Sequence, residues 1–197
     1  MAFSLAAYER LRPMLWHFTH KQNLPLIRSS RTLYCASRLL PDALGDKPRR
    51  DRSIRTGLPV LRDQALLADG SIAFEGGWSL ADFVSDLNRR VFFWSGWSDR
   101  PVRSGRRAFA RYKATDTVLR LPFRGVVRHS PYFSRCNSGA TRKQDGDAVP
   151  RGPETFLPAE ECAFDAAAVV EVSFLGCLSL PNETETGPSL EGPWEPL

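Results

Sequence analysis

The residues best placed for chemistry lie near the start of the chain, in residues 15–20, LWHFTH. Their apolar character predicts a short strand. Side chains alternate along a strand, so we expect Trp16 and Phe18 on one face and His17 and Thr19 on the other. The strand runs directly into a predicted helix, and a histidine at such a junction can hydrogen-bond a bound cofactor.

Two later features could act together with this histidine. Residues 91–94, VFFW, predict a buried aromatic strand, and Glu154 starts a predicted strand, 154–157, behind a glycine-rich polar loop at 137–152. Aromatic rings offer a stacking surface, and a carboxylate can stabilise positive charge or accept a proton. The chain therefore supplies a histidine, an aromatic strand and a glutamate, in that order.

The first helix must fix the end of the histidine strand. Asn23 is positioned to cap this helix, and Leu24 and Ile27, with Leu26, give it an apolar face. Pro25 falls in the first turn, where a missing amide costs least. We expect this helix to pack against the core beside the histidine.

A second helix must position the aromatic strand. It begins after Ser79, because Asp82 three residues later completes a capping-box pattern. The apolar residues at helical spacing are Leu80, Phe83, Val84 and Leu87. The helix ends at residues 88–90, NRR, where cations suit a helix C-terminus. We predict further strands at 32–36, 117–121 and 167–175, a short helix within 100–113 and a surface loop over 40–56.

The charge distribution separates a basic body from an acidic end. The chain has 27 Lys and Arg residues against 22 Asp and Glu, and residues 181–197 contain four glutamates and no basic residue. The remainder therefore carries a net charge of +9, which could hold the phosphates of a dinucleotide or a nucleic acid, or could only keep the surface solvated. We expect the Pro- and Gly-rich end, 181–197, to be disordered or lightly docked.

Length and composition indicate one domain of ordinary globular character. The chain has 197 residues, of which 42% are hydrophobic. Charged residues interrupt the N-terminal segment, so we expect no signal peptide, no membrane association and a cytoplasmic location. The four cysteines are too far apart for a zinc motif, so we expect buried free thiols and no metal; His17 and His20 lack a third ligand nearby.

The order of histidine, aromatic strand and glutamate resembles the ADP-ribosyltransferase superfamily. Residues 17–27, with His17-Phe18-Thr19, Asn23-Leu24 and Ile27, look like the opening motif of its histidine-tyrosine-glutamate branch, which includes the DNA-modifying toxins called DarT. Residues 91–95 look like the second motif, with phenylalanine or tryptophan in place of the usual tyrosine, and 154–157 look like the third. The resemblance covers residues 15–175 and indicates a divergent bacterial branch.

This resemblance implies a fold and a reaction. The fold would be α+β, a single domain over 1–180 in which two small packed antiparallel sheets with peripheral helices surround an NAD cleft. The reaction would cleave the bond between nicotinamide and ribose in NAD, through an oxocarbenium-like transition state, and transfer ADP-ribose to a nucleic acid or a protein. The basic segment 100–113, with Phe109 and Tyr112 among its arginines, favours a nucleic acid, although an exposed basic helix face explains it equally well.

The resemblance also implies roles for individual residues. Glu154 would hold a ribose hydroxyl and stabilise the transition state, and His17 would bond the adenosine-side ribose. The backbone at Phe18 or Thr19 would take the nicotinamide amide. The stacking ring would come from Phe92, Phe93 or Trp94. The pyrophosphate would be held by arginines. Arg62, Arg142 and Arg151 are candidates by their flanking residues, and Arg28 and Arg31 are others; of these we take Arg62 and Arg151 as cofactor-binding residues.

Each of these roles has a structural alternative. His17 could be a core histidine that bonds a backbone carbonyl, Glu154 could be a surface carboxylate, and the aromatic run could be plain core. The missing tyrosine also allows an inactive nucleotide- or nucleic-acid-binding module on the same fold. An RNA 2′-phosphotransferase, which relies on a histidine and arginines without a glutamate, and a basic scaffold of unrelated fold are further alternatives.

Overall fold

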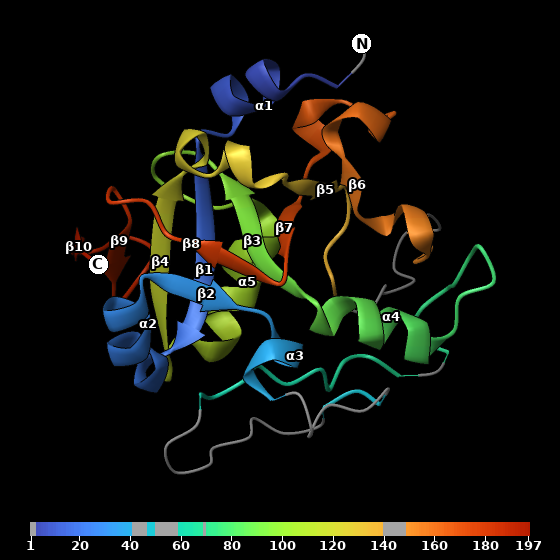
Figure 1. Ribbon diagram of the computed structural model, residues 1–197, viewed down its shortest axis with the longest axis horizontal. Coiled ribbons are helices and arrows are strands. Elements are labelled where there is room, and N and C mark those ends of the chain that lie inside the picture. The colour runs from blue at the N-terminus through green and yellow to red at the C-terminus, as the bar shows by residue number, and fades with distance from the viewer. Residues whose placement is uncertain (1–2, 41–46, 50–58, 69, 140–148) are drawn as a thin grey trace.

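Antiparallel strands form the centre of the molecule, and short helices lie around them (Figure 1). The computed structural model describes residues 3–40, 47–49, 59–68, 70–139 and 149–197. The helices are α1 (Leu5–Leu11), α2 (Leu24–Ser30), α3 (Ala36–Leu39), α4 (Leu80–Asn88) and α5 (Arg103–Tyr112). The predicted α+β class is therefore confirmed, and most of the predicted 40–56 loop lies outside the described residues.

The principal sheet has eight strands in the order β10-β9-β4-β1-β3-β7-β5-β6. These are β1 (Met14–His20), β3 (Arg90–Gly96), β4 (Asp116–Pro122), β5 (Tyr132–Ser134), β6 (Leu157–Pro158), β7 (Glu171–Leu175), β9 (Glu185–Gly187) and β10 (Glu195–Pro196). A separate two-stranded sheet pairs β2 (Thr32–Tyr34) with β8 (Cys177–Ser179). This arrangement differs from the expected pair of small packed sheets.

The first strand alternates as its sequence predicts. Trp16 and Phe18 are buried in a cluster with Phe109 of α5, whereas Leu15 joins the main core with Phe93. That core lies on the opposite face of the sheet from α5 and includes residues of α1, α2, β2 and β8. Each face of β1 is therefore covered by a different apolar layer.

The sheet divides at β1 and β3, two neighbours in its centre. They are in register only at Met14–Gly96, Leu15–Ser95 and Trp16–Trp94. Beyond that point β1 stays paired with β4 as far as His20, and β3 stays paired with β7 back to Arg90. Residues 17–20 of β1 and 90–93 of β3 therefore border a gap in the sheet.

The second helix is fixed by the predicted capping box. Ser79 Oγ accepts a hydrogen bond from the Asp82 amide, and the Asp82 carboxylate accepts one from the Ser79 amide. The helix buries Phe83, Val84 and Leu87 and ends at Asn88, directly before β3, as predicted. Local signals within one turn specify this element.

Two predicted late strands are shorter than expected. Glu154 belongs to a 3₁₀ turn, η4 (Pro153–Thr155), because Pro153 favours a turn and Thr155 Oγ1 accepts a hydrogen bond from the Gly152 amide at 2.8 Å. Within 167–175 the strand begins only at Glu171 and follows a second 3₁₀ turn, η6 (Ala166–Ala168). The other 3₁₀ turns are η1 (Lys21–Asn23), η2 (Phe123–Gly125), η3 (Val127–His129) and η5 (Ala159–Glu161).

The acidic C-terminal segment, expected to be disordered or lightly docked, pairs with the principal sheet. It contributes β9, which pairs with β4, and β10, which pairs with β9. The Arg31 guanidinium donates to the carbonyls of Pro181 and Leu197, both at 2.6 Å. Pairing with an existing strand edge supplies the order that the composition of this segment does not predict.

From the sequence we expect buried free thiols, no metal and no membrane association. The four cysteines are free; Cys35 and Cys162 are buried, and Cys136 and Cys177 are partly buried. Across the described ranges, no three His, Cys, Asp or Glu side chains gather as a metal site would require. None of the helices in those ranges has the length and apolar character needed to cross a bilayer.

Candidate functional site

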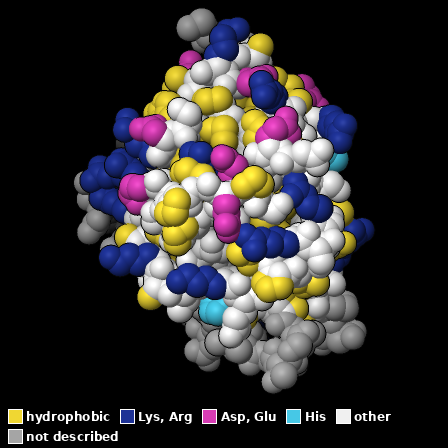
Figure 2. Space-filling view, turned by 90° about the vertical axis from the view of Figure 1, so that its left-hand side faces the viewer, with side chains coloured by type: hydrophobic (Ala, Val, Ile, Leu, Met, Phe, Trp, Pro, Cys, Tyr) yellow, Lys and Arg dark blue, Asp and Glu magenta, His cyan; other side chains and the backbone are white. Residues whose placement is uncertain are grey.

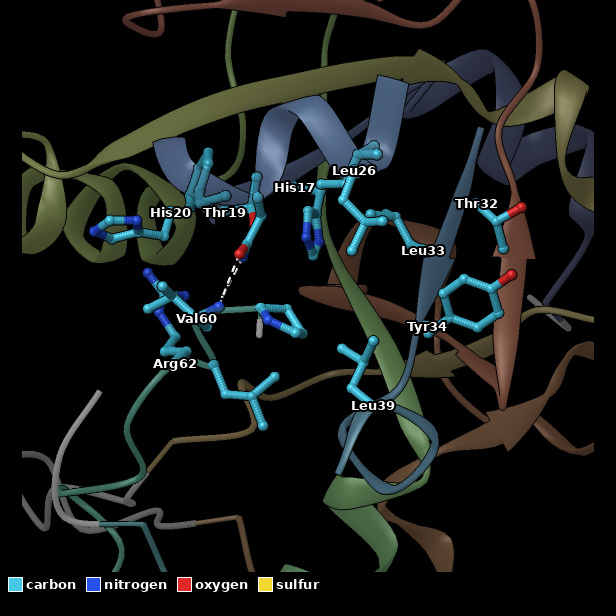
Figure 3. A pocket seen from close by; sticks show the side chains of 15 residues that line it. His17, Thr19, His20, Leu26, Thr32, Leu33, Tyr34, Leu39, Val60 and Arg62 are labelled. Carbon is cyan, nitrogen blue, oxygen red and sulfur yellow. Dashed lines mark hydrogen bonds between the residues drawn. The ribbon is translucent and has the colours of Figure 1, made fainter. Parts of the chain in front are cut away.

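A pocket of about 140 Å³ lies beside the divided end of β1 (Figure 3). It is bounded by β1, α2, β2, α3 and residues 59–62. Leu33, Leu39, Val60 and Leu61 give it an apolar wall, while His17 and Arg62 supply polar groups. Its volume is below the roughly 300–1,000 Å³ that encloses a drug-sized ligand. It can therefore hold only part of a larger ligand.

His17 bridges the two halves of the sheet. Its Nδ1 lies 2.8 Å from the carbonyl oxygen of Phe92 on β3, and its ring stacks at a tilt 5.3 Å from the ring of Phe93. A carbonyl oxygen only accepts, so Nδ1 carries the proton and Nε2 is left as an acceptor. The structural alternative for this histidine, a bond to a backbone carbonyl, is therefore present, and the second ring nitrogen is not used by that bond.

The surroundings of His17 keep it neutral. Burial is the main cause that lowers its pKa from 6.5 to about 4; the nearby charge of Arg62 acts in the same direction, and the Phe92 carbonyl and Asp116 act against it. The imidazole is therefore uncharged near neutral pH. A neutral ring can accept a hydrogen bond from a hydroxyl, which an imidazolium cannot do.

The backbone of Phe18 faces the gap in the sheet. In an antiparallel strand, the N–H and C=O of successive residues point to alternate neighbours. Lys21 N–H bonds to Thr115 O, on the side of β4, so odd-numbered residues of β1 point to β4 and Phe18 points to the other side. The register with β3 ends at Trp16, so Phe18 has no register partner there. One donor and one acceptor therefore face the gap beside His17.

Asn23 holds the far wall of the pocket in place. Its side-chain Nδ2 donates to Val60 O and to Thr19 Oγ1, each at 2.9 Å, and its Oδ1 accepts from Val60 N–H at 2.8 Å. Figure 3 labels Thr19 and Val60, the two residues that Asn23 joins. Asn23 occupies the N-cap position of α2, but its side chain makes no cap hydrogen bond. The predicted cap is therefore a clamp between distant segments.

Of the five candidate arginines, only Arg62 lines the pocket among the described residues. Its guanidinium lies 4.6 Å from the centre of the Tyr112 ring and 3.8 Å from Asp116 Oδ2. Arg28 pairs with Glu195, Arg31 holds the C-terminal segment, and Arg151 is 2% exposed and bonds to loop carbonyls. Arg142 lies outside the described residues. Arg62 is thus the candidate arginine that the described part of the structure places at the pocket.

The aromatic strand contributes mainly to the core. Phe93 is 1% exposed and lies between His17 and Phe174. Phe92 packs against Phe156, and the Trp94 ring is covered by α5, where an added Cβ on Gly105 would lie 2.8 Å from it. The rings of the predicted stacking surface therefore pack against other elements, and the strand serves the pocket through the Phe92 carbonyl.

Two glutamates outside the pocket lining differ in burial. Glu154 is exposed on η4 and does not line the pocket. Glu171, which the sequence analysis did not select, is 2% exposed at the start of β7. A charged residue inside the apolar run 169–174, VVEVSF, was the signal that could have identified it, because an unpaired glutamate is rarely fully buried.

Replacing Asn23 by leucine tests the clamp. We expect Asn23→Leu to lower the free energy of unfolding by about 1–3 kcal/mol, because Val60 loses partners for both backbone groups. Urea denaturation followed by tryptophan fluorescence measures this change. Gln22→Leu, at an exposed neighbour, should leave the stability unchanged. Equal losses in both variants would contradict a specific clamp.

The lowered pKa of His17 predicts a dependence of stability on pH. Between pH 6.5 and about 4 the unfolded chain binds a proton at His17 that the folded chain does not, so acid favours unfolding. Relative to His17→Asn, the wild type should lose up to about 3 kcal/mol of stability across this range. Urea melts at several pH values measure the difference, which a constant offset between the two proteins would contradict.

Comparison with known proteins places the chain in a family. The model of DUF7002, a family of unknown function, matches residues 13–177. No curated protein matches the chain, and no solved structure does. The matched range includes β1, the pocket beside it and Glu171, so these features lie within the shared region. Because the match spans most of its length, the chain belongs to the DUF7002 family of unknown function.

Proposed function

We propose that this protein is an NAD-dependent ADP-ribosyltransferase, with the pocket beside β1 as its nicotinamide-ribose site. The observation that carries the proposal is the gap between β1 and β3. There, the Nε2 acceptor of His17 and the backbone donor and acceptor of Phe18 lie next to an apolar wall. From the sequence we expect His17 to bond the adenosine-side ribose; here we propose that it bonds the sugar next to the nicotinamide, because its ring lies beside the Phe18 backbone.

The chemistry of the pocket suits a neutral aromatic amide joined to a sugar. A carboxamide has one donor and one acceptor, which complement the C=O and N–H of Phe18. A ribose hydroxyl can donate to Nε2 of the neutral His17. The pocket is too small for a dinucleotide, so the phosphates would lie at its mouth, where the Arg62 guanidinium can bind their oxygens.

The reaction would break the bond between the nicotinamide nitrogen and the ribose carbon. Nicotinamide leaves with the bonding electrons, the acceptor's nucleophile adds to the ribose carbon, and a carboxylate takes the proton that the nucleophile loses. Glu154 is the residue proposed for this carboxylate. Its exposed place on η4 leaves it open to an incoming acceptor.

A binding module without turnover is the second candidate function. It is favoured by the position of Glu154 outside the pocket lining and by the burial of the neighbouring Thr155, whose hydroxyl accepts a hydrogen bond from the Gly152 amide. In that case the pocket would still bind NAD, and the glutamate would be a surface residue.

Helix α5 offers a surface for an anionic acceptor. Gly105 and Phe109 are buried against the sheet, and the exposed side of the segment carries Arg103, Arg106, Arg107, Arg111 and Lys113. The helix has no acidic residue, whereas acidic and basic side chains alternate over much of the face in Figure 2. The helix ends at Tyr112, whose ring contacts Arg62 at the pocket. We therefore favour a nucleic acid as the acceptor.

The first test is NAD binding and turnover. NAD at millimolar concentration should raise the melting temperature of the wild type, and His17→Ala should abolish the shift because Nε2 is lost. Nicotinamide release, followed by chromatography, should stop in Glu154→Gln while the NAD-induced shift persists. A shift without release in the wild type would select the binding module, and no shift would contradict the pocket assignment.

The second test concerns the acceptor. The double variant Arg106→Glu/Arg107→Glu should weaken binding of labelled single-stranded DNA or RNA and flatten its salt dependence, because fewer counterions are released. Fluorescence anisotropy at several salt concentrations measures both effects. The control Arg124→Glu/Arg135→Glu makes the same change in net charge at exposed positions on other elements. Equal effects of the two variants would exclude α5 as the binding surface.

A further inference from the structure

A buried carboxylate anchors the loop that follows β5. Glu171 Oε2 accepts a hydrogen bond from the Ser138 backbone N–H at 2.8 Å, and Oε1 accepts one from Ser138 Oγ at 3.2 Å. Glu171 stands opposite Trp94 of β3 and Ser134 of β5 in the sheet register. The side chain that holds Ser138 is thus fixed on a central strand.

A buried arginine anchors the same loop from its other end. Arg151 Nη2 donates to the carbonyls of Asn137 at 2.9 Å and Gly139 at 3.3 Å, and Nη1 donates to the carbonyl of Val149. Its own backbone N–H bonds to Ala73 O at 2.8 Å. Residues 137–139 and 149–151 are therefore tied to each other and to the segment before α4.

These anchored residues lead directly to Glu154. Gly152 packs so closely on Glu75 that an added Cβ would lie 2.8 Å from the Glu75 carbonyl oxygen. The Gly152 amide then bonds to Thr155 Oγ1, which closes the η4 turn. The backbone that carries Glu154 thus starts from a point fixed by Arg151.

We propose that Glu171 and Arg151 are positioning residues that fix the Glu154 turn, and that the charge state of Glu171 sets how firmly they do so. We call the attachment of residues 137–139 and 149–151 by Glu171 and Arg151 the loop clamp. The role of the turn in catalysis rests on the proposed function, whereas the loop clamp does not. The charged or titratable groups that act on Glu171 are Arg151, Arg62 and Cys136, from three different segments.

The loop clamp should respond to pH near neutrality. Burial raises the pKa of Glu171 to about 7, although the Ser138 bonds and the charges of Arg151 and Arg62 act against this rise. Above this pH the ionised carboxylate makes charge-assisted bonds to Ser138 and attracts Arg151, and below it both interactions weaken. The stability that protonated Glu171 contributes is complete below pH 4.5 and is lost as the pH rises through about 7. A firmer loop at high pH thus accompanies a lower overall stability.

The direct test observes the Ser138 amide and needs no turnover. In the wild type, the amide proton shift of Ser138 should titrate with a midpoint near pH 7, and its protection from hydrogen exchange should rise across the same range. Glu171→Gln should remove both dependences while keeping the side chain's size. Glu183→Gln, at an exposed position, should leave them as in the wild type. A Ser138 amide that does not titrate in the folded wild type would overturn the loop clamp.

A second experiment tests whether the loop clamp affects turnover through Glu154. The rate of nicotinamide release should rise several-fold in the wild type as the pH passes through 7, and in Glu171→Gln it should be lower and independent of pH there. NAD affinity, measured by the thermal shift, should be unchanged in Glu171→Gln. A titrating Ser138 with no turnover would refute the proposed reaction and leave the loop clamp standing. A titrating Ser138 with the same pH profile in both proteins would refute the positioning role.

Discussion

The hydrogen bond from His17 Nδ1 to the Phe92 carbonyl joins the two halves of the sheet where they separate. If β1 and β3 were paired along their whole length, the Phe92 carbonyl would bond to β1, the Phe18 backbone would bond to β3, and no site would exist. Because the strands diverge, each has a backbone polar group that the other strand does not bond. The His17 side chain bonds to one of these groups, the Phe92 carbonyl. The need to satisfy a buried backbone carbonyl thus fixes the tautomer of His17 and leaves Nε2 as the acceptor, while burial keeps the ring neutral.

The parts of the fold that could be predicted are those specified within a few residues. The capping box at Ser79 and Asp82 and the alternation along residues 15–20 depend only on neighbours, and both are confirmed. Asn23 shows where this reasoning stops. Its local context predicts a helix cap, but its amide binds Val60, 37 residues away, and no local pattern encodes that partner. Arg62 could likewise be selected among five arginines only after the chain was folded.

The two glutamates show the same limit in the candidate site. Glu154 was selected by its order along the chain, and the structure places it on an exposed turn that the sequence read as a strand. Glu171 lies within a predicted strand and was not among the candidate residues, yet its burial is what raises the pKa of its carboxylate. The sequence thus identified the strand that borders the site, and tertiary contacts determine which polar groups are buried there.

The pairing of β9 with β4 has a consequence for self-association. β4 is a seven-residue strand whose inner edge pairs with β1, and residues 118–120 of its outer edge pair with β9. Val118 and Leu119 are fully buried, so removal of β9 would leave an apolar strand with open backbone groups. Such an edge is a template for strands of other molecules. The acidic C-terminal segment therefore covers an edge that could otherwise pair with strands of other molecules.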